Sequence, residues 1–166
     1  MKRTLATISL ALGIALSTGV AMAQTPAGGT VVTAGSIEIS GRFARASLPN
    51  APVGGAYMTI TNTGPNDDRL LGVTTAAGVV DLHEMSMSNG AMSMQMLHDG
   101  IVIPAGETIV LAPSGLHMMI SPLAAPLEQG ETLDMVATFE HAGDVPLTFD
   151  ILALNARSYP EAEQTK

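Results

Sequence analysis

The stretch that decides the fold spans residues 79–97 and reads VVDLHEMSMSNGAMSMQML. Side chains of alternating character recur along it with a period of two, as in a β-strand whose two faces differ. The pair Asn89-Gly90 lies in the middle, and this dipeptide is the strongest short-range signal for a tight hairpin turn. The sequence therefore predicts two antiparallel strands, with Val80 and Leu82 on one face and Asp81 and His83 on the other.

A two-residue turn also determines the register of the hairpin. It places six side chains on one face, as the cross-strand pairs His83–Met96, Met85–Met94 and Met87–Met92. Opposite Cβ atoms on such a face are about 4.5–5.5 Å apart and diagonal ones about 7–8 Å. Two side chains can then reach one ion, with His83 and Met94 as a diagonal pair.

A third strand carries the same two residue types. In His117-Met118-Met119, alternation puts His117 and Met119 on one face and turns Met118 to the other, with Leu116 and Ile120. Met118 is therefore expected in the core, and Met119 is expected beside His117.

The clustered side chains favour a soft metal. Five of the 11 methionines fall between Met85 and Met96, and with His83 they form a cluster of thioether and imidazole donors. Thioether sulfur with imidazole suits Cu(I) better than Mg, Ca or Mn, and zinc usually takes His with Cys or carboxylate. The alternative is that methionine fills gaps in the core or forms a pliable apolar surface.

Other polar residues are weaker candidates for a site. His98, beside Asp99-Gly100, and His141 are both expected in exposed turns. The triplet Asp67-Asp68-Arg69 could bind a cation, but a turn with a local ion pair is the more common use of such a sequence.

The absence of cysteine narrows the chemistry. The chain has no Cys, so it forms no disulfides and performs no thiol chemistry. Blue-copper electron-transfer sites need His, His and Cys, so this class is excluded as well.

The first 23 residues have the layout of a bacterial secretory signal peptide. Lys2 and Arg3 precede an apolar run from Leu5 to Leu16, and Ala21-Met22-Ala23 is a small-x-small cleavage site. A membrane anchor would need nearer 20 apolar residues. We expect cleavage before Gln24, a periplasmic location and no stable membrane insertion afterwards.

Length and charge bound the remaining 143 residues. They fit one domain with an adequate core. The formal charge of −8 for the full chain becomes −10 after cleavage. Such an acidic protein has no basic surface that would attract nucleic acid or anionic lipid. We also expect a monomer.

The mature chain reads as short strands separated by Gly- and Pro-containing turns, which indicates an all-β, Greek-key sandwich or barrel with a single domain. We expect a flexible N-terminal segment at 24–35, a β-domain at 36–155 and a C-terminal tail at 156–166. The nine predicted strands are Ser36 to Ser40, Gly55 to Thr61, Leu70 to Thr74, Val79 to Met87, Ala91 to Leu97, Glu107 to Leu111, His117 to Ile120, Thr132 to Phe139 and Leu147 to Leu154.

Several motifs resemble the PCu(A)C family of periplasmic copper chaperones. Ten residues separate His83 from Met94, 22 separate Met94 from His117, and one separates His117 from Met119. This H-x10-M-x22-H-x-M spacing is far more specific than any single His or Met. The resemblance spans about Ser36 to Leu154 and includes the motifs Ala44-Arg45-Ala46, Gly55-Ala56-Tyr57, Asn62-Thr63-Gly64, Asp68-Arg69-Leu70, Ile103-Pro104-Ala105-Gly106 and Pro113-Ser114-Gly115.

The resemblance implies a cupredoxin-like fold that binds one Cu(I) per chain through His83, Met94, His117 and Met119. It implies delivery of copper toward the dinuclear centre of cytochrome c oxidase, with a copper-accepting oxidase subunit or a Sco-type thiol protein as partner. Phe43 and Leu116 replace a Trp and a Tyr that are common in the family. The chain also lacks the His/Met-rich C-terminal tail that gives some relatives a Cu(II) site.

Alternatives to a chaperone remain open. A periplasmic copper storage or resistance binder would use the same site without a dedicated acceptor. We expect no enzyme, because the chain has neither a Ser/His/Asp order nor a paired-carboxylate motif. A purely structural sandwich would bind no copper.

Overall fold

The computed structural model describes residues 27–88 and 90–160, and the predicted signal peptide lies outside them. The described chain is nearly all β and contains no α-helix, so no helix there is long and apolar enough to cross a membrane. A short 3-10 turn, η1 (Ala27–Gly29), precedes the strands. These are β1 (Val32–Ala34), β2 (Ile37–Arg45), β3 (Gly54–Asn62), β4 (Asp68–Thr75), β5 (Val80–Ser88), β6 (Ala91–Met96), β7 (Ile101–Ile103), β8 (Thr108–Leu111), β9 (Leu116–Ile120), β10 (Thr132–Phe139) and β11 (Gly143–Leu152).

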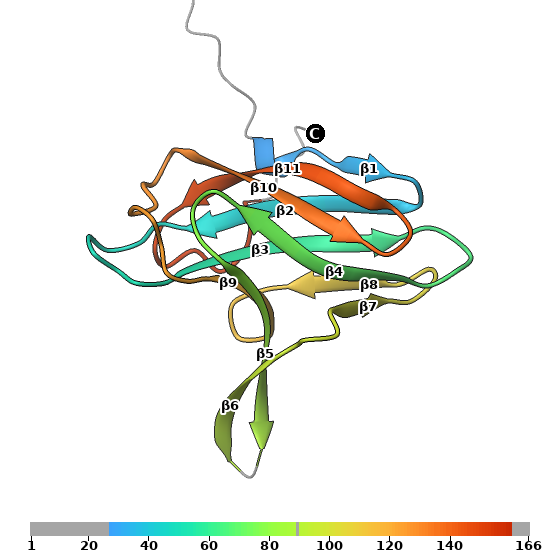
Figure 1. Cartoon of the computed structure of the whole chain (residues 1–166), viewed down its shortest axis with the longest axis horizontal. Helices are drawn as coiled ribbons and strands as arrows, with labels where there is room; N and C mark the ends of the chain where they lie inside the picture. The colour runs from blue at the N-terminus through green and yellow to red at the C-terminus, as the bar shows by residue number, and fades with distance from the viewer. Residues whose placement is uncertain (1–26, 89, 161–166) are drawn as a thin grey trace, which may run out of the picture.

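The strands pair into one continuous sheet in the order β6-β5-β9-β8-β3-β2-β11-β10-β4-β7, with β1 added beside β2. The sheet curls into a half-barrel around one core, and the β5–β6 hairpin projects from it (Figure 1). Most pairs are antiparallel, whereas β2–β11 and β8–β9 are parallel. The predicted all-β fold with a single domain is confirmed.

All nine predicted strands are present, and the prediction missed two short ones. β1 and β7 have three residues each, too few for a readable alternation. β11 also begins earlier than predicted, at Gly143, and contains Pro146. Pro146 pairs only with Val136 of β10, because β11 meets β2 from Asp150 onward. A residue without an N–H is tolerated where a strand has no neighbour on that side.

Alternation along the strands builds the core. The buried side chains include three methionines, Met58, Met118 and Met135, which are at most 2% exposed. The face opposite to Met118 on β9 carries His117 and Met119, so the core and the candidate site lie on opposite faces of the same strands. Met118 is thus a core residue, as predicted.

A bulge in β2 exchanges the two faces of the strand. The register with β3 shifts between Ser40 and Phe43, where Gly41 has a φ of 57° that glycine adopts readily. Before the bulge Ile39 faces the core, and after it Ala44 does. Phe43 is thereby turned to the outer face, where its ring packs on Tyr57 with centroids 4.8 Å apart. The bulge thus creates an aromatic pair on the face that carries the candidate site.

The segment 24–35, predicted to be flexible, is structured where it is described. β1 pairs with β2, and the buried Arg42 holds η1 in place. The Arg42 guanidinium donates to the carbonyl oxygens of Thr30 (2.7 Å), Thr148 (3.1 Å) and Ala27. Burial lowers the pKa of Arg42, while the nearby Asp150 opposes this shift. Within residues 27–35, the buried Arg42 and the pairing of β1 with β2 thus hold the chain against the domain.

The start of the predicted tail 156–166 is also anchored. Tyr159 Oη donates to Asp150 (2.6 Å), whose carboxylate accepts the Gly28 N–H as well (3.0 Å). Burial, followed by this contact with Asp150, raises the pKa of Tyr159 to about 12. Residues 161–166 lie outside the described part, and the domain boundaries stay predictions.

The triplet Asp67-Asp68-Arg69 does not form the local ion pair that we predicted. Arg69 pairs instead with Glu140 across the sheet (3.4 Å). Asp68 is 7% exposed and accepts the backbone N–H groups of Arg69 (2.7 Å), His141 (3.0 Å) and Ala142 (3.1 Å). Three donated N–H groups satisfy a buried carboxylate more completely than one flexible cation would.

Candidate metal centre

The hairpin has the predicted register. His83 lies opposite Met96, Met85 opposite Met94, and Met87 opposite Met92. Gly90 has a φ of 79°, the conformation that a two-residue turn requires after Asn89, which itself is outside the described residues.

A third strand completes the site. β9 lies on the other side of β5 and pairs His117 directly with His83, and Met119 with Asp81. One row across three strands therefore contains Met96, His83 and His117. Met94 is diagonal to His83 toward the hairpin turn, and Met119 lies one step along β9 in the other direction.

The two histidines are brought together closely. Their rings are stacked, with centroids 5.7 Å apart and planes 24° from parallel. His117 Nδ1 is 3.0 Å from the Gly115 carbonyl oxygen, and His83 Nδ1 is 3.4 Å from that of Asp81. A carbonyl only accepts, so these contacts favour the tautomer of the neutral ring that has the proton on Nδ1 and the lone pair on Nε2. This arrangement orients two imidazoles whose Nε2 atoms could bind a metal.

Exposure rises from the histidines to the hairpin turn. His83 is 4% exposed, Met96 38%, Met94 51%, Met92 59% and Met87 75%. Exposed thioethers in this number are unusual for side chains that normally fill a core. These methionines extend from the buried His83 to solvent, so a soft ion or a partner could approach the site along the hairpin.

The structure separates the predicted ligands into two groups. It brings His83 and His117 together, whereas Met94 and Met119 share their face in register. His98 and His141 are exposed in turns, as predicted, and His141 Nδ1 lies 3.4 Å from Asp68.

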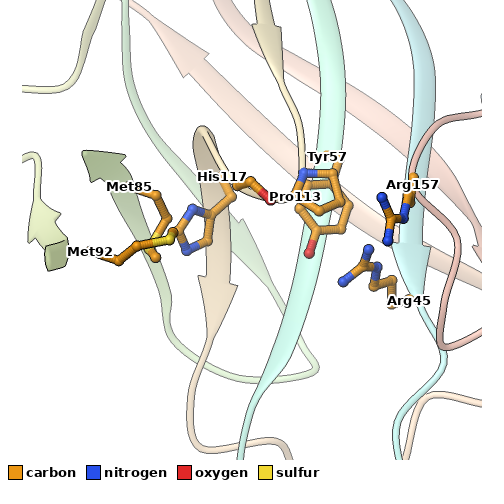
Figure 2. A pocket seen from close by; sticks show the side chains of 8 residues that line it. Arg45, Tyr57, Met85, Met92, Pro113, His117 and Arg157 are labelled. Atoms are coloured by element: carbon orange, nitrogen blue, oxygen red, sulfur yellow. The ribbon is translucent and has the colours of Figure 1, made fainter. Parts of the chain in front are cut away.

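A pocket of about 480 Å³ lies beside His117, and Figure 2 shows its lining. The thioethers of Met85 and Met92 and the His117 ring form one side. Arg45 and Arg157 point toward each other on the other side. The remaining lining residues are Tyr57, Pro113 and Ser114.

Sequence analysis missed the polar wall of this pocket. Arg45 and Tyr57 lie in motifs shared with the PCu(A)C family, but we assigned them no role, and Arg157 was not noticed. The Arg45 guanidinium lies 5.5 Å from the centre of the Tyr57 ring, and its Nε donates to the Ala156 carbonyl oxygen (2.6 Å). Burial raises the pKa of Tyr57, and Arg45 partly offsets this. The scarcity of basic residues in an acidic chain is a signal that could have drawn attention to both arginines.

The donor set limits the ions that this site could hold. Within residues 27–88 and 90–160, no group of three His, Asp, Glu or Cys side chains gathers in a way that could bind a metal. Thioethers lie near the histidine pair instead: Met96 is opposite His83, and Met85 and Met92 line the pocket with His117. Imidazole and thioether together fit Cu(I) and provide nothing that Mg or Ca prefers.

Comparison with known families identifies a relationship over most of the chain. Residues 37–151 match the family described as "Putative lipoprotein LpqE-like". The "Putative lipoprotein Lxx21020" of Leifsonia xyli is 33% identical over 132 residues, which cover 79% of this chain and 76% of that protein.

Solved structures agree on the fold. The copper-bound PCuAC domain from PmoF2 is 26% identical, with a TM-score of 0.64 over 75% of this chain and 98% of that one. The apo form of the same domain gives a TM-score of 0.65 over 77% and 98%, also at 26% identity. Apo-DR1885 from Deinococcus radiodurans, at 23% identity, has a TM-score of 0.56 over 92% and 97%. These likenesses confirm the predicted cupredoxin-like fold.

Proposed function

The chain belongs to the LpqE-like family and has the fold of PCuAC domains, and from this premise we propose that it is an exported copper-binding chaperone. Its cargo would be one Cu(I) per chain. The family's lipoprotein description and the leader at residues 1–23 support export, and we propose the periplasm as its location.

One observation carries this proposal. His83 and His117 face each other on β5 and β9, and each Nδ1 is directed at a backbone carbonyl. Both Nε2 atoms therefore remain available on a face rich in thioethers. A structural sandwich would not require two oriented imidazoles beside exposed methionines. A copper-bound neighbour with 26% identity adds independent support.

We assign Met94 and Met119 as the sulfur ligands, by the spacing shared with PCu(A)C proteins. Met94 lies diagonally from His83 toward the hairpin turn, and Met119 lies diagonally from His83 in the opposite direction. Met85 and Met92 share a pocket with His117, so they are the alternates during uptake or handover. A ligand set without thiolate holds Cu(I) less tightly than two cysteines do, and this favours release.

Delivery is the finer part of the proposal. The direction we propose is toward the dinuclear copper centre of cytochrome c oxidase, through an oxidase subunit or a Sco-type thiol protein. Binding and release of an ion require no catalysis, so the chain acts as a binder and not as an enzyme.

The first experiment measures Cu(I) stoichiometry on the purified mature protein against a competing chelator. One Cu(I) per chain is expected, with weak binding of Zn(II) or Mg(II). X-ray absorption of the loaded protein should show mixed sulfur and nitrogen scattering. A shell of only nitrogen and oxygen would contradict the proposal.

Variants then test the ligands. Replacing His83, Met94, His117 or Met119 by Ala should lower the Cu(I) affinity by about tenfold or more, as loss of one ligand does. Met118→Leu is the matched control on the same strand, since its side chain is in the core and the exchange conserves volume. Loss of binding in the control, with retention in Met119→Ala, would reject the assignment.

Transfer distinguishes a chaperone from a storage protein. Copper-loaded protein is mixed with a reduced oxidase copper domain or Sco-type acceptor, separated and assayed for metal. Cu(I) should move to the thiol acceptor and not return. Retention against the acceptor would favour storage or resistance.

A further inference from the structure

The pocket beside His117 contains the accessible arginines of the described chain that form no ion pair, in a protein that is acidic overall. The chain has 15 Asp and Glu against 7 Lys and Arg, and four of the basic residues, all arginines, are described. Arg42 is buried, and Arg69 pairs with Glu140. Arg45 and Arg157 are left, and among the described residues neither forms an ion pair. Both line the pocket that contains His117.

The two guanidinium groups face each other although their charges repel. Figure 2 shows them directed at one another across the edge of the pocket. Arg45 is held there by Tyr57 beneath it and by its Nε bond to Ala156, so its two terminal nitrogens remain free to donate. No acidic residue lines the pocket in the described chain. Two convergent guanidinium groups that form no ion pair within the described residues attract an anion.

Carboxylate is the anion that fits this site best. Arginine donates in a planar fork that matches the two oxygens of a carboxylate, and two such forks can clamp one group. The Tyr57 and Ser114 hydroxyls border the same space. An anion there would lie in the same pocket as His117, Met85 and Met92, on its opposite side, so that its bearer would face the proposed copper site.

We propose that Arg45 and Arg157 form a carboxylate-binding subsite, which receives an aspartate or glutamate side chain of the protein that exchanges copper with this chain. The assignment to a partner rests on the proposed function, because only a copper-exchange partner must approach His117. The rest of the surface carries net negative charge and repels an acidic patch. One positive spot beside the ligands therefore selects both the partner and its orientation.

The test uses apo-protein at low salt and follows the Met methyl and Arg Nε–H signals by NMR. The probes are acetate, inorganic phosphate, a capped peptide with one Glu, and the same peptide with Gln. The Glu peptide should bind at least as tightly as acetate and should shift Met85, Met92 and Arg45, while the Gln peptide should not bind. Added salt should weaken the interaction.

Variants locate the effect. Arg157→Gln should lower the affinity for the Glu peptide about tenfold, the loss expected for one charge-assisted contact. Arg157 is exposed, so the change leaves the fold intact. Arg69→Gln is the matched control. Arg69 lies at the start of β4, does not line this pocket and pairs with Glu140. An equal loss of affinity for the Glu peptide in this control would show that only the overall charge matters. It would overturn the proposed subsite.

Other outcomes also decide the matter. No binding, or a preference for phosphate, would overturn the carboxylate assignment. Binding of acetate without the peptide would overturn the partner as its source. Cu(I) affinity, measured separately, should change less than about threefold in Arg157→Gln, because a single charge in this solvated pocket is screened. If the protein binds Cu(I) but no carboxylate, this inference fails and the proposed function stands. If the protein binds the carboxylate but no Cu(I), the proposed copper function is wrong. The assignment of the carboxylate to a copper-exchange partner is then wrong as well.

Discussion

The methionines of the core and those of the β5–β6 hairpin occupy opposite environments in one small domain. Met58, Met118 and Met135 are at most 2% exposed and are enclosed by the curled sheet. Met87, Met92 and Met94 are 51–75% exposed on the hairpin that extends beyond it (Figure 1). The core positions gain stability from burial, while the exposed positions gain very little. Packing within the domain therefore does not explain the hairpin methionines, and a count of methionines alone would not distinguish the two groups.

The largest effect should come from exchanging one methionine of each group for alanine. Met118→Ala should lower the free energy of unfolding by about 2–5 kcal/mol, because it removes buried atoms and leaves a cavity. Met92→Ala should change it by less than about 0.5 kcal/mol, as is usual for a surface site. Guanidinium denaturation of the apo-protein measures both. Similar losses in the two variants would show that the hairpin is packed in solution and would remove the contrast.

The sequence predicted the hairpin well, because its information is local. Alternation around Asn89-Gly90 specifies which residues pair, and the observed pairs of His83, Met85 and Met87 follow from it. The position of Met118 in the core followed from the same period of two. The placement of β9 beside β5 is a long-range pairing. Only the spacing shared with PCu(A)C proteins indicated it.

The parts that sequence reasoning missed depend on residues far apart in the chain. Arg45 and Arg157 meet across 112 positions, and no local pattern brings them together. The role of Arg42 was not predicted either, because the bulge and η1 enclose it only in the folded chain. Such contacts arise from how the strands stack, and alternation along one strand does not encode this.

The next largest effect on stability should come from a substitution in the curled sheet that leaves the hairpin unchanged. Asp68 lies at the start of β4 and accepts three backbone N–H groups. Asp68→Asn keeps the shape but loses charge-assisted bonds, and at neutral pH it should destabilise the fold by about 1.5–3 kcal/mol. Cu(I) affinity should not change. A fall in affinity equal to the loss of stability would show that the two regions are coupled.

The same residue predicts a pH dependence. Burial tends to raise the pKa of Asp68, but the hydrogen bonds from Arg69, His141 and Ala142 outweigh burial and lower it below the ordinary value. A group with a lowered pKa in the folded state stabilises it fully above the unfolded pKa of about 3.9. This contribution is lost as the pH falls through the folded pKa. Unfolding of wild type and Asp68→Asn between neutral pH and pH ~2 should converge at the acidic end.

Copper release should respond to acid in a different way. Imidazole must be neutral to bind a metal, whereas a thioether takes up no proton in this range. Release should therefore take up at most two protons per Cu(I), one for each histidine. Chelator competition over a pH series measures this number. Uptake of three or more protons would show that a carboxylate also binds the ion.

Within the hairpin, leucine substitutions should separate ligands from their surroundings. Met94→Leu should lower Cu(I) affinity about tenfold, which corresponds to about 1.4 kcal/mol. Met87→Leu, nearest the turn and 75% exposed, is the matched control and should have little effect. Met85→Leu is informative because Met85 shares the pocket with His117. If Met85→Leu weakened binding and Met94→Leu did not, the sulfur ligand would be Met85.

The smallest effect should come from the loop that leads into β9. Ser114 has a φ of 96°, in the region that favours glycine. Ser114→Gly relieves about 1–2 kcal/mol of strain but gives the unfolded chain more freedom, by about 0.5–1 kcal/mol. A net stabilisation of about 0.5 kcal/mol should follow, measured by denaturation. Asn50→Gly is the matched control, since its φ is 61° and asparagine tolerates that conformation, so it should be nearly neutral. Cu(I) affinity should not change in Ser114→Gly, because pairing with His83 and the Gly115 carbonyl oxygen hold His117 in place. A stabilised variant that binds copper more weakly would show that strain in this loop positions His117.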